Sequence, residues 1–164
     1  TGGNLFTSLF GKMAVYTLLF TLMGWSLQVI LYKWMHFPLA GSLGEMMLIM
    51  LLFVMACESV ATLIVSMVPV LRLAVCIGSL YSVLGVSLCG FTLPVEMMPI
   101  GVRGLAFMYP LTYYYRSYVQ IGIFDAGIGG WYLYAVILLG FVLLNFVGMK
   151  RLEHAYVRLN YPRN

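Results

Sequence analysis

Four apolar stretches, each long enough to cross a lipid bilayer as a helix, occupy most of this 164-residue chain. They are residues 13–32, 46–71, 73–95 and 126–149, and Glu58 in the second stretch is the only charged residue within them. A helix rises about 1.5 Å per residue, so about 20 apolar residues cover the ~30 Å hydrocarbon core. Transmembrane strands would instead show alternating polarity over about 10 residues, and the sequence has no such alternation. The pattern predicts an all-α fold, a polytopic transmembrane helical bundle.

The composition excludes a soluble domain of this length, because 63% of the residues are hydrophobic and only 9% are charged. The formal net charge of +4 does not indicate a nucleic-acid partner, since the basic residues lie at the ends of the apolar stretches. The expected partner of the surface is the lipid bilayer. We expect one transmembrane domain over residues 1–164, with four spanning helices at 13–35, 45–68, 72–93 and 130–150.

The basic residues predict the orientation, because they are enriched in cytoplasmic segments. Four crossings place both ends of the chain and the turn near residue 70 on one side. That side holds six basic residues: Lys12, Arg72, Lys150, Arg151, Arg158 and Arg163. The opposite side holds three: Lys33, Arg103 and Arg116. The bias predicts that both ends, including a tail at 151–164, are cytoplasmic.

Residues 94–124 form an irregular segment before the last spanning helix. Pro94 and Pro99 break the helix twice, and Pro110 then separates two apolar pieces, each too short to span a bilayer. Backbone freed from helical bonding at membrane depth is tolerated only where protein or a wet cavity covers it. We therefore predict a re-entrant helical hairpin in the outer leaflet; the alternative is an external loop lying on the membrane.

Two features of this segment support the hairpin. Arg103 and Arg116 would be costly at the bilayer centre, so the two pieces belong near an interface. The aromatic run Tyr113-Tyr114-Tyr115 suits a region where rings meet both lipid and water. We further expect Glu96 to cap, or to stabilise by its charge, the start of the first short helix.

Glu58 is the main candidate for a substrate pathway, because an acid within a spanning helix is costly to expose to lipid. Thr62 and Ser66 follow at positions i+4 and i+8 and are expected to share one polar face with it. Two interpretations stay open. Glu58 either holds helices together as a protonated or hydrogen-bonded side chain, or takes part in binding a substrate or moving a proton.

Small and polar residues also recur at helical spacing in two spanning helices. They are Thr17, Thr21, Gly24 and Gln28 in the first, and Gly78, Ser82, Gly85 and Cys89 in the third. Helices associate in lipid through close packing at small residues and through interhelical hydrogen bonds. We interpret both faces as packing seams, with a substrate path as the alternative.

The sequence offers little support for catalysis or metal binding. His36 and His154 are expected on opposite sides of the membrane, and the three cysteines lie within apolar stretches without metal-site spacing. Gly11-Lys12 lacks the other residues of a phosphate-binding loop, since Phe6 stands where its first glycine is required. We therefore expect no enzyme activity and no bound cofactor or metal. If ATP is used, another polypeptide hydrolyses it.

Three motifs resemble those of the type-2 ATP-binding-cassette (ABC) exporter permeases. The most specific is Gly90-Phe91-Thr92-Leu93-Pro94-Val95-Glu96-Met97-Met98-Pro99. It is followed by Tyr109-Pro110-Leu111-Thr112-Tyr113-Tyr114 and Gly122-Ile123-Phe124. The family shows a similar glycine-aromatic stretch, Pro-x-Glu-x-Met-Pro, and a Pro-Leu-Thr-Tyr before its last helix. Phe10-Gly11-Lys12 is a weaker match, similar to the Gly-Lys that opens the family's third helix.

The resemblance implies a six-helix permease of which this chain is the C-terminal portion, a fragment carrying the third to sixth helices. It implies that residues 1–12 end a cytoplasmic loop that couples to a separate ATPase subunit, through Phe10, Gly11 and Lys12. It implies a second permease subunit, identical or not, and export of a drug-like, lipid-like or other substrate across a bacterial inner membrane. The implied hairpin motif comprises Phe91, Pro94, Glu96, Pro99, Pro110, Leu111, Thr112 and Tyr113. Glu58 departs from the family pattern, because the family usually has an apolar or small residue at this position.

Two other classes of function stay open from the residues alone. One is a channel or secondary transporter that uses Glu58 as its intramembrane coupling acid. The other is a membrane scaffold that binds a partner through the aromatic hairpin. Secondary transporters often show internal repeats with interrupted helices in both halves, and this sequence shows no such repeat.

Overall fold

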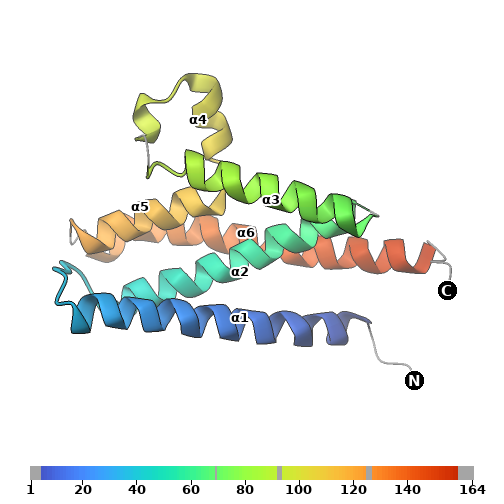
Figure 1. Ribbon diagram of the computed structural model, residues 1–164, viewed down its shortest axis with the longest axis horizontal. Coiled ribbons are helices and arrows are strands. Elements are labelled where there is room, and N and C mark those ends of the chain that lie inside the picture. The colour runs from blue at the N-terminus through green and yellow to red at the C-terminus, as the bar shows by residue number, and fades with distance from the viewer. Residues whose placement is uncertain (1–4, 69, 92–93, 125–126, 159–164) are drawn as a thin grey trace.

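The computed structural model describes residues 5–68, 70–91, 94–124 and 127–158, and these are helical with short connections (Figure 1). The α-helices are α1 (Leu5–Val29), α2 (Leu43–Met67), α3 (Leu71–Leu88), α4 (Ile100–Ala106), α5 (Pro110–Gly122) and α6 (Gly127–Arg158). A π-helical turn, η1 (Ile30–Trp34), continues α1, and a 3-10 turn, η2 (Val95–Met97), precedes α4. No strand occurs among the described residues, so the prediction of an all-α fold is confirmed.

Three of these helical segments are long and apolar enough to cross a membrane. They are Phe10–Trp34, Leu43–Met67 and Leu71–Leu88. Within its described residues, helix α6 contains a shorter apolar portion, Gly129–Asn145. The chain is therefore a multi-pass helical membrane protein.

The helices α1, α2 and α6 run side by side along the long axis, with α5 beside α2 and α6 and with α3 beside α2 and α5 (Figure 1). The most extensive packing joins α2 to α6, and α5 packs against both. One buried core joins these three helices: Met46, Ile49 and Ala56 of α2, Ile121 of α5, and Trp131, Ala135 and Leu138 of α6. Helix α4 stands apart from this core, beyond α3 in Figure 1.

Several helix boundaries differ from the predicted ones. Helix α3 ends at Leu88 rather than at residue 93, because Gly90 adopts a φ of 99°, a left-handed conformation that stops a helix before Pro94 is reached. Helix α1 begins at Leu5 rather than at residue 13, and α6 runs from Gly127 to Arg158 rather than over 130–150. The last six residues of the predicted tail lie outside the described residues.

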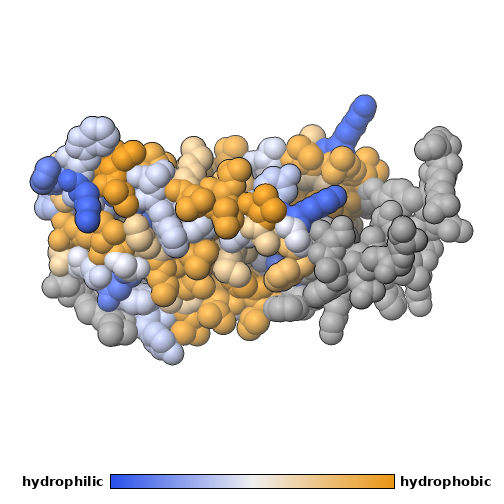
Figure 2. All heavy atoms as spheres, turned by 90° about the horizontal axis from the view of Figure 1, so that it is seen from below, coloured by the Kyte–Doolittle hydropathy of each residue, from blue (hydrophilic) through white to orange (hydrophobic). Residues whose placement is uncertain are grey.

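The surface over α1 is largely hydrophobic through the middle of the molecule, with hydrophilic residues gathered at its left-hand end (Figure 2). Leu18, Met23 and Leu27 of α1 are each more than half exposed, and so are Leu80 and Val83 of α3. Apolar surface of this extent is costly in water and is expected where lipid or another membrane helix covers it.

The packing-seam interpretation fits Gly24 and Gln28 of the first helix and half of the face on the third. Thr21, Gly24 and Gln28 of α1 are buried, and a Cβ at Gly24 would lie 2.3 Å from the Met50 Cε of α2. On α3, a Cβ at Gly85 would lie 3.0 Å from the Tyr109 ring, so glycine permits this close approach. Gly78 has open space beside it and Ser82 is exposed, so this end of the α3 face packs against nothing described.

Candidate functional site

A cavity of about 400 Å³ lies between α1, α2 and α6, and we call it the Glu58 crevice. Its walls are mostly apolar and include Met13 and Trp25 of α1 and Met55 of α2. Its polar residues come from all three helices: Thr17 and Thr21 from α1, Glu58 from α2 and Asn145 from α6. Glu58 lies about 22 Å from Leu43 and about 14 Å from Met67 along α2, so the crevice is far from both ends of that helix.

The Glu58 carboxyl group has one hydrogen-bonding neighbour among the described residues. The Thr17 hydroxyl lies 2.5 Å from Glu58 Oε2 and 3.0 Å from the Met13 carbonyl oxygen of its own helix. A hydroxyl carries one hydrogen, so Thr17 cannot donate fully to both oxygens. The other carboxyl oxygen, Oε1, is buried without a partner in the described part of the chain.

Two further residues that line the crevice also hold a buried oxygen atom without a hydrogen-bond partner in the described part of the chain. The Thr21 hydroxyl and the Asn145 Oδ1 are buried and have no hydrogen-bond partner among the described residues. Thr21 is only 5% exposed, and the Asn145 Nδ2 has only a 4.0 Å contact to the Met13 sulfur. Buried polar atoms are usually hydrogen-bonded, because an unpaired one costs about 1–3 kcal/mol. Three residues that line one cavity, one from each of three helices, therefore each hold a buried oxygen of this kind.

The structure only partly brings together the three residues predicted to share a polar face on α2. The Thr62 hydroxyl donates to the Glu58 backbone carbonyl at 2.8 Å, and Thr62 and Glu58 line a second cavity of about 330 Å³. Ser66 donates instead to the Leu63 carbonyl at 2.7 Å and lines neither cavity. Ser66 is therefore not placed with Glu58.

The sequence reasoning missed Asn145, and it interpreted Thr17 and Thr21 as part of a packing seam, with a substrate path as the alternative. Asn145 is an amide within an otherwise apolar stretch, which is a signal the sequence does contain. That Asn145 and Thr21 line the same cavity as Glu58 follows only from how α6 and α1 pack on α2.

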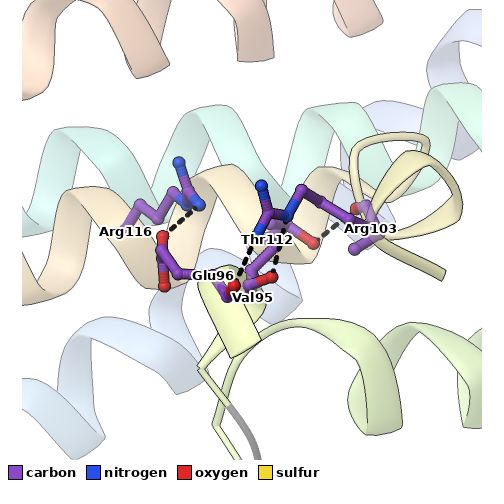
Figure 3. A network of polar contacts seen from close by, with 6 residues as sticks. Val95, Glu96, Arg103, Thr112 and Arg116 are labelled. Atoms are coloured by element: carbon purple, nitrogen blue, oxygen red, sulfur yellow. Dashed lines mark hydrogen bonds and ion pairs between the residues drawn. The ribbon is translucent and has the colours of Figure 1, made fainter. Parts of the chain in front are cut away.

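The second polar region is a network that holds the predicted hairpin segment, shown in Figure 3. A Glu96 carboxylate oxygen accepts a hydrogen bond from Arg116 of α5 at 2.8 Å, which joins η2 to α5. The Arg103 side chain of α4 turns back and donates to the backbone carbonyls of Val95, at 3.2 Å, and Glu96. Both arginines are therefore bonded to protein.

The expected capping role of Glu96 is wrong. Helix α4 begins after Pro99 with no side-chain cap, and the Glu96 side chain points to Arg116 of α5 instead (Figure 3). Glu96 lies in its own 3-10 turn, and Pro99 separates that turn from α4. The Arg116 guanidinium instead offers the Glu96 carboxylate a charge-assisted hydrogen bond.

The motif residues around Pro110 form the joint between α4 and α5. Pro110 is the first residue of α5, where its missing N–H costs nothing. Thr112 is fully buried and donates to the Ala106 carbonyl at 2.7 Å, and Tyr113 donates to the Phe107 carbonyl at 2.9 Å. These bonds satisfy the last carbonyls of α4 with side chains of α5.

The joint between α4 and α5 packs against the middle of α3. The Tyr81 hydroxyl donates to the Met108 carbonyl at 3.1 Å, and the Tyr81 and Tyr109 ring centroids are 4.5 Å apart. Tyr81 lies about 10 Å from the end of α3 at Leu88, so the chain turns back well inside the length of that helix. Tyr109, Pro110 and Leu111 also line an apolar groove of about 730 Å³ between α2 and α3.

The remaining predicted residues occupy simpler positions. Phe91 lies edge-on to Tyr115 with ring centroids 6.2 Å apart, and Pro94 precedes η2. Phe10, Gly11 and Lys12 lie in the first part of α1 and are exposed. No group of three or more His, Cys, Asp or Glu residues that could hold a metal ion occurs in the part of the chain that the structure describes.

The helical framework and the hairpin segment match a known family model. The match to the ABC-2 type transporter model covers residues 4–123, a range that takes in α1 to α5. No curated protein and no solved structure shows significant similarity to the chain. Because the family match covers well over half of its length, the chain belongs to the ABC-2 type transporter family, whose membrane domain is a transport permease.

Proposed function

We propose that this chain is part of the permease subunit of an ABC exporter, which moves its substrate with ATP hydrolysed by a separate subunit. The observation that carries the proposal is the family match, which extends over α1–α5 and includes the proline-broken segment. The family also argues against the two alternatives, a secondary transporter with Glu58 as coupling acid and a membrane scaffold.

The proposed topology has four spanning helices, α1, α2, α3 and α6. Three meet the length and hydropathy expected of a span, and α6 carries a fourth apolar portion. The end of α2 and the start of α3 lie at the same end of the bundle as the start of α1 and the end of α6 (Figure 1). The six-to-three bias of basic residues supports a cytoplasmic position for that end, in a bacterial inner membrane.

The segment α4–α5 is proposed to re-enter the outer leaflet as a hairpin and to close the outer end of the pathway. Two observations support this proposal. The joint between α4 and α5 contacts Tyr81, which lies about 10 Å from the end of α3 at Leu88, and the Arg103 and Arg116 side chains are bonded to protein groups. A charged side chain near a membrane interface is tolerated when it is paired with protein groups in this way.

The proposed partners are an ATPase subunit and a second permease subunit, identical or not. The exposed start of α1, with Phe10, Gly11 and Lys12, is the proposed contact region for the ATPase. The exposed apolar faces of α1 and α3 leave room for further membrane helices or lipid. The substrate is expected to be drug-like, lipid-like or otherwise lipophilic.

Reconstitution tests this proposal. The permease, expressed with the ATPase subunit it copurifies with, should form a complex in proteoliposomes that hydrolyses ATP and moves a lipophilic dye only when ATP is supplied. A Walker-motif variant of the ATPase is the matched control and should abolish movement. Dye movement driven by an ion gradient without ATP, or no copurifying ATPase, would contradict an ABC exporter.

A further inference from the structure

The Glu58 crevice has the composition of a binding site rather than of a packing defect. A packing defect between helices is lined by apolar atoms and stays dry, whereas this cavity gathers three buried oxygens without partners. In the described chain only two other buried side-chain atoms lack a partner, Gln28 Oε1 and Trp131 Nε1, and neither residue lines the crevice. Three of the five unpaired atoms of the described chain therefore belong to residues that line this one cavity.

The unpaired atoms also share one chemistry. Glu58 Oε1 and Asn145 Oδ1 are hydrogen-bond acceptors, and the Thr21 hydroxyl oxygen can accept as well. Glu58 is the only ionisable residue that lines the cavity in the described chain, so no basic side chain there offsets a negative charge. A ligand that complements this set must offer hydrogen-bond donors and a positive charge.

The remaining cavity walls indicate that the rest of the ligand is apolar. Apart from these polar residues, its walls are aliphatic, methionine and aromatic side chains, including Leu18, Leu51, Met55 and Trp25. An apolar wall with a few convergent polar groups is the usual form of a small-molecule site. An ammonium group is also attracted to the face of a tryptophan ring.

We propose that the Glu58 crevice binds lipophilic primary amines, with the ammonium group at Glu58, Thr21 and Asn145 and the apolar tail along α1. A primary ammonium carries three N–H donors and one positive charge, which match three acceptors and one carboxyl group. The proposal names a substrate class for the exporter and rests on the proposed function for transport, whereas binding itself does not depend on ATP.

The test compares three ligands of one shape on the parent permease in lipid nanodiscs. Equilibrium dialysis measures binding of phenylbutylamine, phenylbutanol and phenylbutyltrimethylammonium, with protein-free nanodiscs to subtract partition into lipid. The amine should bind at least about tenfold more tightly than the alcohol, which lacks the charge, and than the quaternary ion, which lacks N–H donors. Equal binding of any two of these ligands, or no binding above the nanodisc background, would overturn the proposal.

Variants then assign the selectivity to the crevice. Glu58→Gln keeps the shape of the side chain and should remove the preference for the amine over the alcohol. Thr21→Val and Asn145→Leu should each weaken amine binding by about fivefold or more. The control is Ser26→Ala, which removes an exposed hydroxyl of the same helix that bonds to the Met23 carbonyl, and it should bind the amine like the parent.

The outcomes separate this site from the exporter proposal. A parent-like amine preference in Glu58→Gln places the ligand elsewhere and overturns the site. If amine binding is selective and Glu58-dependent but no ATP-driven amine movement occurs in proteoliposomes, the site stands and the exporter role for amines fails. If ATP drives dye movement while amines bind no better than alcohols, the exporter stands and the site fails.

Discussion

The Glu58 crevice and the α4–α5 segment are both polar regions in an apolar protein, but they satisfy their polar atoms differently. In the α4–α5 segment, Arg103, Thr112 and Arg116 all bond to groups of the same chain. In the crevice, Glu58, Thr21 and Asn145 each keep a buried oxygen without a partner among the described residues. A network whose polar atoms are all bonded stabilises one conformation of the protein. Acceptors without partners can instead form hydrogen bonds with a ligand, and these bonds contribute to the free energy of binding.

The comparison predicts opposite results for the same kind of substitution in the two regions. Removing a bonded hydroxyl loses a hydrogen bond of the folded protein, but removing an unbonded hydroxyl loses none. The four substitutions below test this contrast, and the expected loss of stability falls from the first to the last.

Thr112→Val should cause the largest loss. It removes the buried hydroxyl bond to the Ala106 carbonyl, which keeps only the longer 3.3 Å bond from the Tyr109 N–H, at a cost of about 1–1.5 kcal/mol in free energy of unfolding. Thermal unfolding in detergent should show a lower Tm. Ser87→Ala is the control, because its exposed hydroxyl bonds to the Val83 carbonyl of its own helix, and its Tm should match the parent. A parent-like Tm for Thr112→Val would show that the α4–α5 joint is not held as described.

Tyr81→Phe should cause a smaller loss. The ring contact with Tyr109 is kept, but the hydroxyl bond to the Met108 carbonyl is lost, at a cost of about 0.5–1.5 kcal/mol. The loss should appear locally as faster hydrogen exchange around residues 106–110, with exchange at the α2–α6 core unchanged. Uniformly faster exchange would mean that Tyr81 supports the whole bundle rather than the joint.

Glu96→Gln should cost less than about 1 kcal/mol, because the Glu96 side chain is 71% exposed and its pair with Arg116 is screened by solvent. The difference in Tm from the parent should shrink further as salt is added. A large loss that persists at high salt would indicate that this ion pair is covered by lipid or protein.

Thr21→Val is the counterpart of Thr112→Val in the crevice and should leave stability within about 0.5 kcal/mol of the parent, or raise it. The substitution has nearly the same shape and removes a buried hydroxyl with no partner in the described chain. Its Tm is measured in the same series as that of Thr112→Val. A loss as large as that of Thr112→Val would show that the Thr21 hydroxyl is already bonded in the ligand-free protein.

The sequence was sufficient for the helical class and for the broken segment, because these depend on local patterns. Apolar stretches of membrane length and the prolines at 94, 99 and 110 act on their own backbone, wherever the rest of the chain lies. The end of α3 was misjudged because the sequence does not reveal that Gly90 takes a left-handed conformation before Pro94. Glu96 was misassigned because its partner, Arg116, is distant in sequence and is brought near only by the turn at Pro110.

The crevice was predictable only in part, for the same reason. Glu58 was identified because exposing an acidic side chain to lipid is energetically costly, and Thr62 was identified from helical spacing. Ser66 was included by spacing alone, yet it bonds to the carbonyl of Leu63 and lines neither cavity beside Glu58. Asn145 and Thr21 join Glu58 through packing between helices, which no periodicity within one helix predicts.

The most direct measurement of the difference between the two regions is ligand-induced stabilisation in nanodiscs. Saturating phenylbutylamine should raise the Tm of the parent, because a ligand that binds only the folded state stabilises it. It should raise the Tm of Thr112→Val by the same amount from a lower starting point, and it should not raise the Tm of Glu58→Gln. An equal rise in Glu58→Gln, or no rise in the parent, would contradict an open crevice at Glu58 beside a self-contained α4–α5 network.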